Sequence, residues 1–178
     1  ENTLIKTLKR AKELIEEKKE IFATPALLFF LKNNFTKKDF ENNTQLLQQF
    51  AKLDDHDIYA CLKQWMDHED IVLSKLSNMI INRKLLKVKI QKKPFSQKAI
   101  EDKKTAVMKK LNLSRNLTDY FVFSDKISNK AYSYEKAKIN ILLKDGSIKE
   151  LKDASDQTLN QMFSKKVNKF FLCYLNIK

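Results

Sequence analysis

Glycine, proline, cysteine and histidine are all scarce in this sequence. With one glycine among 178 residues, a glycine-rich phosphate-binding loop is excluded. The two cysteines, Cys61 and Cys173, lie far apart on apolar stretches, which excludes a disulfide framework and predicts buried, reduced thiols in a cytoplasmic protein. No apolar run approaches the roughly 20 residues of a membrane span, and no signal peptide is visible.

The composition that remains is that of a folded and strongly basic protein. Hydrophobic residues make up 43% of the chain and aromatic residues 10%, which excludes a disordered class. The 35 basic and 22 acidic residues give a net charge of +13, which favours anionic partners. Those partners could be nucleic acid, nucleotides, an acidic protein or an acidic neighbouring domain. The lysines are dispersed among Asn, Gln and Glu, however, and such a pattern is also typical of a solvated surface.

Residues 53–90 carry the clearest local pattern. They predict two short helices that lead directly into a strand. Asp54 and Asp57 are placed to accept hydrogen bonds from the free amides of the first helix, and Asp67 and Asp70 repeat the arrangement before the second. At residue 85 the apolar period changes from helical to alternating.

The second of these helices and the strand after it each predict one buried face. The helix residues that share a stripe are Val72, Leu76, Met79 and Ile80. Leu86, Val88 and Ile90 then alternate with polar residues, which predicts a half-buried strand over 85–92.

The sequence before residue 53 is helical throughout. A first helix over 2–19 has one apolar stripe, and Thr24 followed by Pro25 opens a second, largely apolar helix over 25–33. Thr36 and Thr44 open two shorter helices. Because the first two helices have more apolar surface than a short chain needs, we expect self-association, most simply as a dimer.

After the helices, the order of elements predicts an α+β fold. Beyond the strand at 85–92 we expect a helix over 97–112 capped by Ser96, a strand over 119–123, a loop over 124–136, a hairpin turning at Gly146, a helix over 155–164 and a strand over 167–175. With both helices on one face, this order suits a ferredoxin-like antiparallel sheet. We therefore predict a helical region over 1–83 packed on an α+β sandwich over 84–178.

Two segments together resemble a known family. The sequence LDDHDIYACLKQWMDHEDIVLSKLSNMIINRKLLKVKI at 53–90, preceded by FATPALLFFLKNN at 22–34, resembles the region that follows the catalytic core in bacterial HD-domain phosphohydrolases, the group related to dNTP triphosphohydrolases. The resemblance implies the C-terminal portion of such an enzyme, whose partner is its own missing HD core and whose divalent metal lies in that core. It implies no catalytic residue, metal ligand or cofactor in this chain.

The histidines offer little support for a metal site of their own. His56 and Asp57 form a His-Asp pair, but the metal sites of HD enzymes also need an upstream histidine, and His56 is the first of only two. Asp57 already has a capping role. His68, twelve positions later, matches no metal-ligand spacing. A self-contained enzyme built on His56 and Asp57 is thus the weakest hypothesis.

Arg83 and Lys87 are the candidate binding residues. They lie at the junction between the second helix and the strand, where an Arg fork and a Lys can bind phosphate oxygens. In nucleotide-regulated relatives an Arg followed four residues on by a Lys looks similar and contacts a regulatory nucleotide. The alternative is that both residues cap helix carbonyls and cover the strand edge.

Two broader alternatives stay open. The chain could be a free-standing basic module that binds nucleic acid or an acidic protein, with binding that weakens steeply as salt rises. Trp65 could then be a base-stacking platform, although an amphipathic helix would more simply place it in the core.

Overall fold

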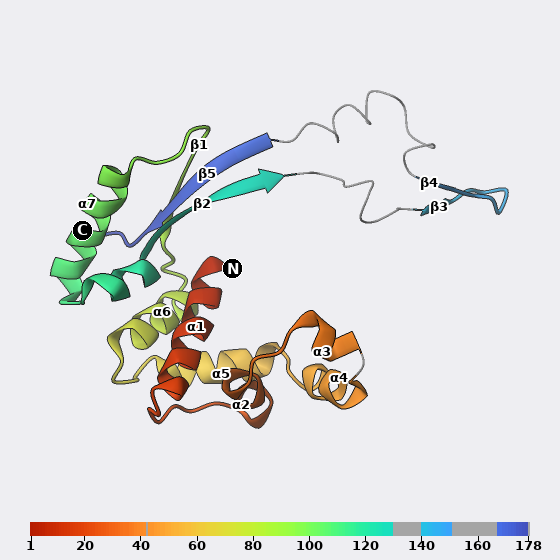
Figure 1. Ribbon diagram of the computed structural model, residues 1–178, viewed down its shortest axis with the longest axis horizontal. Coiled ribbons are helices and arrows are strands. Elements are labelled where there is room, and N and C mark those ends of the chain that lie inside the picture. The colour runs from red at the N-terminus through yellow and green to blue at the C-terminus, as the bar shows by residue number, and fades with distance from the viewer. Residues whose placement is uncertain (42, 130–139, 151–166, 178) are drawn as a thin grey trace. The chain divides into compact units, whose positions relative to one another are not determined.

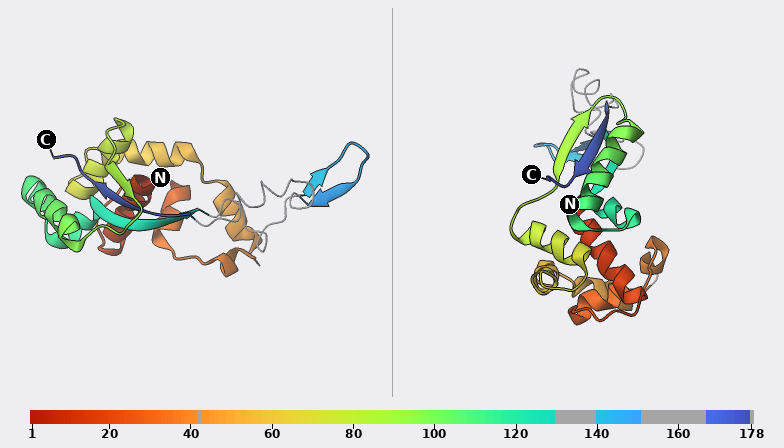
Figure 2. Two further views of the ribbon diagram at one scale, coloured as in Figure 1. Left: turned by 90° about the horizontal axis from the view of Figure 1, so that it is seen from above. Right: turned by 90° about the vertical axis from the view of Figure 1, so that its left-hand side faces the viewer.

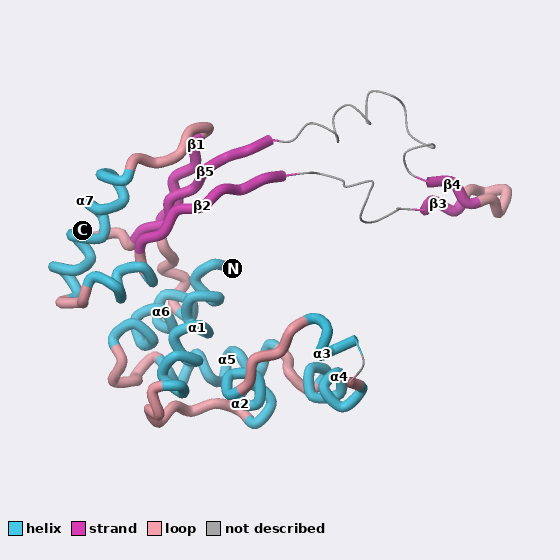
Figure 3. The backbone as a smooth tube through the Cα atoms, viewed as in Figure 1, coloured by secondary structure: helices cyan, strands magenta, loops and turns pink. Residues whose placement is uncertain are grey.

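A computed structural model of the chain describes residues 1–41, 43–129, 140–150 and 167–177 (Figure 1). The helices are α1 Asn2–Glu16, α2 Pro25–Lys32, α3 Lys37–Glu41, α4 Thr44–Ala51, α5 Asp55–Trp65, α6 Ile71–Ile81, α7 Gln97–Leu111 and the 3-10 helix η1 Arg115–Tyr120. The strands are β1 Lys87–Gln91, β2 Val122–Asn129, β3 Asn140–Leu142, β4 Ile148–Glu150 and β5 Val167–Tyr174. The mixed α+β class, with helices first and strands later, is confirmed (Figure 3).

The chain forms two compact units. The first comprises Glu1–Lys87, Lys103–Val122 and Tyr174–Lys178, and the second comprises Val88–Asp102 and Phe123–Cys173. Two segments from the later part of the sequence therefore belong to the same unit as the N-terminal helices. The division into domains over 1–83 and 84–178 stays a prediction.

The core of the first unit lies among α1, α2, α5 and α6. Figures 1 and 2 show α1 lying against α6, and α1 also packs on α2. The buried cluster consists of Ala11, Leu14, Leu27, Leu31, Cys61, Leu62, Trp65 and Leu73. Trp65 is only 1% exposed, and its indole N–H donates to the carbonyl of Phe22 over 2.7 Å, so it is a core residue and not a stacking platform.

Side-chain caps define where most of these helices begin. Thr24 accepts from the amide of Leu27 as predicted, and Asp54 and Asp57 form the predicted reciprocal capping box of α5. Asp70 alone caps α6, because its carboxylate accepts from the Leu73 amide; Asp67 makes no such bond, so the prediction of a repeated pair is wrong. The cap of α4 is Asn43, one residue before the predicted Thr44.

Three helices end at a left-handed residue that is not glycine. Lys18, Arg83 and Asn112 have φ of 59°, 53° and 50°. Just past α1, the amide of Lys19 bonds back to the Leu14 carbonyl, which closes a Schellman motif and ends the helix before the predicted residue 19. A chain with one glycine must accept the steric cost of this conformation at other residue types.

The second unit contains a three-stranded sheet in the order β1-β5-β2 and a separate hairpin of β3 and β4. The Leu175 amide donates to the Phe121 carbonyl over 3.1 Å, so the end of β5 meets the start of β2, as in an antiparallel pair. The hairpin pairs Ile141 with Lys149 and turns at Gly146, whose φ is 82°, as predicted. The predicted helix over 155–164 lies outside the described residues.

Three predictions about the strands are wrong in detail. Val88 and Ile90 of β1 are 54% and 58% exposed, so this strand has no buried face. The strand predicted over 119–123 begins at Val122, because residues 115–120 form η1. Residues 124–129, predicted as loop, continue β2. The rest of that predicted loop, residues 130–136, lies outside the described residues.

Candidate functional site

One face of α6 lines a pocket of about 740 Å³ in the first unit. The opposite face of the helix packs into the protein core through Val72, Leu73 and Leu76. The lining residues come from α6, from the segment before β1 and from the segment after β5: Ile71, Ser74, Lys75, Asn78, Met79, Asn82, Lys84, Leu85, Lys87, Leu175 and Asn176. We call this the α6 pocket. Its volume lies within the roughly 300–1,000 Å³ range of small-molecule sites.

Cations and neutral hydrogen-bonding groups dominate the polar lining of the α6 pocket. Lys75, Lys84 and Lys87 are the charged residues, and within the described ranges none of the three forms an ion pair. No acidic residue lines the pocket. Three ammonium groups without carboxylate partners produce a positive potential that favours an anionic ligand.

Part of this polar lining is held in place by α6 and the turn before it. The Ser74 hydroxyl and the Asn78 amide both donate to the carbonyl of Met66, over 2.6 and 2.8 Å. Asn82 donates to the Asn78 carbonyl one turn later. These bonds fix the row of side chains along the helix before any ligand arrives.

Of the two residues that the sequence proposed together, one lines the α6 pocket. Lys87 lines the α6 pocket, but Arg83 is not among its lining residues. Arg83 is exposed and occupies the left-handed position after α6, where its amide bonds to the Ile80 carbonyl and the next amide bonds to that of Met79.

Among the cations of the pocket, Lys84 also belongs to the charged cluster that the sequence shows at this junction, whereas the sequence analysis missed Lys75. Lys75 lies on α6 in register with Ile71, Asn78 and Asn82, so helical spacing alone could have grouped these residues. Asn176 carried no such signal, because it is distant in sequence and joins the pocket only through the path of β5.

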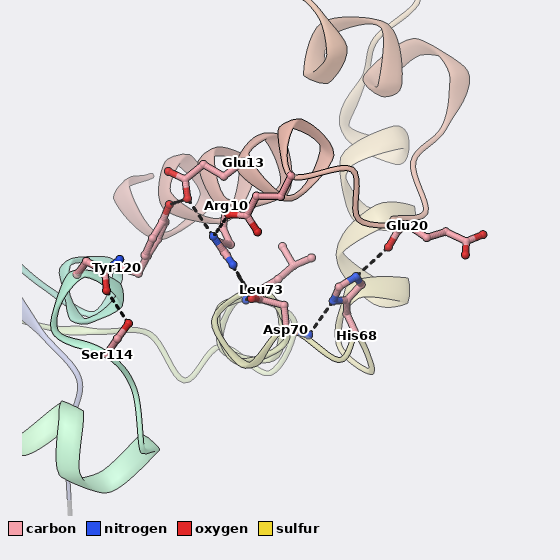
Figure 4. Close-up of polar contacts among 10 residues, drawn as sticks. Arg10, Glu13, Glu20, His68, Asp70, Leu73, Ser114 and Tyr120 are labelled. Atoms are coloured by element: carbon pink, nitrogen blue, oxygen red, sulfur yellow. Dashed lines mark hydrogen bonds and ion pairs between the residues drawn. The ribbon is translucent and has the colours of Figure 1, made fainter.

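A buried ion-pair network fixes the start of α6 against α1 (Figure 4). The guanidinium of Arg10, which is 8% exposed, donates to both oxygens of Asp70, with its shortest bond at 2.8 Å. It also bonds to Glu13 and Glu17 of its own helix. Burial alone would raise the pKa of Asp70, but the bonds from Arg10 and the Leu73 amide outweigh it, so this pKa is lowered.

The network extends to His68 and to Tyr120. The Asp70 amide donates to His68 Nδ1, so the ring carries its hydrogen on Nε2 and donates it to the Glu20 carbonyl. The Tyr120 hydroxyl donates to Glu13, and burial together with this bond raises the pKa of Tyr120. His68 therefore has a structural role at the entrance to α6.

None of the remaining sequence candidates lines the α6 pocket. The His56 side chain is 97% exposed, and Asp57 is engaged in the capping box. Cys61 and Cys173 are buried free thiols as predicted, and burial raises the pKa of both. Across the residues that the structure describes, no three His, Cys, Asp or Glu side chains are grouped to hold a metal ion.

The lining of the α6 pocket offers groups that bind anions. It contains no His, Asp, Glu, Cys or Tyr side chain. Lysine and amide groups can donate hydrogen bonds to phosphate or carboxylate oxygens. The helices in the described ranges include none that is both long and apolar enough to cross a membrane.

In comparisons with known proteins, the chain is similar to part of a phosphohydrolase. No family model matches the chain. The uncharacterized protein YwfO of Bacillus subtilis is 27% identical over 155 residues, which cover 83% of this chain and 33% of that protein. A phosphohydrolase from Bacteroides thetaiotaomicron, known from a crystal structure, has 40% sequence identity to this chain and matches its fold with a TM-score of 0.79. The match covers 98% of this chain and 43% of that one. The chain thus spans less than half the length of either protein.

Proposed function

We propose that this chain is the non-catalytic C-terminal region of an HD-type, metal-dependent phosphohydrolase of the cytoplasm, and that it binds a regulatory nucleotide. The observation that carries the proposal is the α6 pocket, in which three lysines converge without a carboxylate. The likeness to part of a phosphohydrolase supports it, since a phosphohydrolase acts on phosphate compounds. The lining supplies lysine and amide groups that can bind phosphate oxygens.

The triphosphate of a nucleotide is the ligand that suits this lining. Lys75, Lys84 and Lys87 supply ammonium groups for phosphate oxygens, and Asn78 and Asn176 supply amides that can bond to a sugar or base. Arg83 lies next to Lys84 and reaches the same ligand from outside the lining in this proposal. Binding at the junction of α6 and β1 would couple the ligand to the helical core through α6.

The described residues do not fit the metal of the parent enzyme. The sequence has two histidines, of which His56 is almost fully exposed and His68 uses both ring nitrogens in structural bonds. A water-activating centre needs several ligands that converge on one ion. We therefore assign metal binding and hydrolysis to the HD core, and bracing of that core and of a homo-oligomer to this chain.

Nucleotide titrations test the proposal. The purified chain is titrated with dNTPs, NTPs and inorganic triphosphate, and binding is followed by calorimetry. Lys75→Gln, Lys84→Gln and Lys87→Gln should each weaken binding by about tenfold, because a hydrogen bond to a charged group contributes roughly 1.5–3 kcal/mol. Lys63→Gln, an exposed lysine on α5, is the matched control and should leave binding unchanged.

Three results would contradict parts of the proposal. Equal weakening by Lys63→Gln would show that only net charge matters, and unchanged binding in Arg83→Ala would remove Arg83 from the site. Metal-dependent phosphatase turnover by the pure chain would overturn the non-catalytic assignment.

The net charge of +13 supports a second candidate, a basic module that binds nucleic acid or an acidic protein. Duplex DNA binding that falls steeply with salt, together with no nucleotide binding, would favour it.

A further inference from the structure

Five phenylalanines gather on α2, α3, α4 and the turn between α2 and α3, far from the α6 pocket in sequence. They are Phe29, Phe30, Phe35, Phe40 and Phe50, and their ring centroids lie between 5.2 and 6.1 Å apart. Most of the pairs are edge-to-face, and the single stacked pair is Phe29 with Phe35. Each ring therefore packs against its neighbours, and these contacts hold the cluster together as one unit.

This cluster is left partly open to solvent. None of the five rings is fully buried, and Phe50 is 56% exposed. Phe30, Phe35, Phe40 and Phe50, with Lys12, Asn33 and Asn34, line a pocket of about 260 Å³. We call this the phenylalanine pocket. Contiguous exposed aromatic surface of this kind marks interaction sites in soluble proteins. Its volume is below that of most small-molecule sites, but it can hold one large side chain.

One lysine lines the phenylalanine pocket, and three more lie on the helices that carry its rings. Lys12 lies in its wall, where the ammonium donates to the carbonyls of Asn33 and Phe30 over 2.6 and 3.5 Å. Lys32, Lys37 and Lys38 are exposed on α2 and α3, and none of these four lysines forms an ion pair with any described residue.

Acidic residues balance these lysines only in part. The acids on α3 are Asp39 and Glu41, and the bonds from the amide and hydroxyl of Thr36 keep Asp39 ionised. Four lysines against two carboxylates leave excess positive charge on these helices, which is complementary to carboxylates.

We propose that the phenylalanine pocket is a docking site for an acidic peptide segment of a partner protein. The segment inserts one large apolar side chain between the rings, and its carboxylates face Lys37, Lys38 and the ammonium of Lys12. Charge complementarity selects this occupant. Two copies of the chain placed cluster to cluster would bring the same lysines together, and like charges oppose that contact. Nucleobase stacking needs free ring faces, and each of these rings already packs against at least two others.

Peptide binding tests the chemistry of the occupant. The probe is a short fluorescein-labelled peptide with a single Phe between glutamates, titrated with the 178-residue chain and followed by anisotropy. Two matched peptides replace the Phe with Ala or the glutamates with Gln. Each replacement should weaken binding by about tenfold or more, because it removes either the buried apolar side chain or the charge complement.

Paired variants of the chain locate the binding. Phe50→Gln should weaken binding by about tenfold. Leu47→Gln removes an equally exposed apolar side chain of α4 that does not line the pocket, and it should have no effect. Lys37→Glu should weaken binding, whereas Lys63→Glu on α5 should not. Circular dichroism melts check that each variant is folded.

Several outcomes would overturn the proposal. These are no saturable binding of the acidic peptide, binding that is insensitive to its Phe, and equal effects of Phe50→Gln and Leu47→Gln. Self-association that Phe50→Gln abolishes would make a second copy the occupant. Single-stranded DNA that displaces the peptide, and loses affinity in Phe50→Gln, would make nucleic acid the occupant.

Discussion

Arg10 and Asp70, sixty residues apart in sequence, form a forked ion pair that joins the middle of α1 to the first turn of α6. The Arg10 side chain is 9% exposed and that of Asp70 14%, so the pair is largely removed from water. Asp70 also caps α6, the helix that lines the α6 pocket. One carboxylate thus determines both where α6 begins and which surface of α1 it meets.

Replacing Arg10 should strongly destabilise the first unit. Arg10→Met keeps the apolar stem but leaves Asp70 and Glu17 without their cation, which should lower the free energy of unfolding by about 3 kcal/mol. Urea denaturation measures this. The control is Lys9→Met on the same helix. Lys9 pairs with Glu13 at 3.8 Å but its side chain is 64% exposed, so the change should be about 0.5 kcal/mol or less. An equal loss of unfolding free energy in both variants would show that the buried pair stabilises the fold no more than the exposed one.

The lowered pKa of Asp70 predicts a loss of stability in acid. Unfolded aspartate has a pKa near 3.9, and the folded value lies below it, so the stabilisation is fully present above about pH 4 and is lost as pH falls through the folded value. Asp70→Asn keeps a capping side chain and should flatten the fall in melting temperature between about pH 5 and pH 2. Asp55→Asn, an exposed carboxylate on α5, should leave that slope nearly unchanged. A slope in Asp70→Asn as steep as in the unchanged protein would be the contrary result.

Glycine at position 83 should stabilise the fold. The φ of Arg83 is 53°, a conformation that costs an L-residue about 1–2 kcal/mol and glycine almost nothing, although glycine loses more chain entropy on folding. Arg83→Gly should therefore raise the free energy of unfolding by about 0.5 kcal/mol. Lys84→Gly, at the next residue and without a positive φ, should not. The same Arg83→Gly variant is also titrated with nucleotide. Weakened binding would indicate that the Arg83 side chain binds phosphate, and unchanged binding would leave Arg83 only its role at the end of α6.

Two serines on α6 predict opposite responses to alanine. Ser77 is fully buried, and among the described residues its hydroxyl has no hydrogen-bond partner. Ser77→Ala should stabilise the protein by about 1 kcal/mol, because it removes an unsatisfied polar group and improves helix propensity. Ser74→Ala should destabilise it by about the same amount, because the Ser74 hydroxyl bonds to the Met66 carbonyl. The melting temperatures of both variants test this prediction. A lower melting temperature for Ser77→Ala would contradict it and would mean that the Ser77 hydroxyl makes a stabilising hydrogen bond.

Local signals in the sequence predicted the helix starts well. Thr24 with Pro25 and the Asp54–Asp57 box act within a single turn, so their chemistry is visible in a few consecutive residues. The turn between β3 and β4 was predicted in the same way, because Gly146 is suited to the positive φ that it adopts there.

Features that depend on distant residues were not predictable in this way. Tyr120 sits in η1 and not in a strand, and its hydroxyl bonds to Glu13, 107 residues away. The left-handed conformation of Arg83 was not predicted, because the sequence suggested only that its side chain binds phosphate or caps helix carbonyls. Likewise, Lys75 and Asn176 come together only because the chain returns after β5 to the unit in which it began.

The return of the chain to the first unit after β5 affects the order in which the parts of that unit can form during synthesis. Helices α1 to α6 find one another within the first 81 residues, so this bundle can assemble while translation continues. The α6 pocket as described cannot, because Leu175 and Asn176 form part of its wall and must first leave the ribosomal tunnel. Any ligand of the pocket therefore stabilises chains that have emerged as far as Asn176 and gives no help to shorter nascent ones.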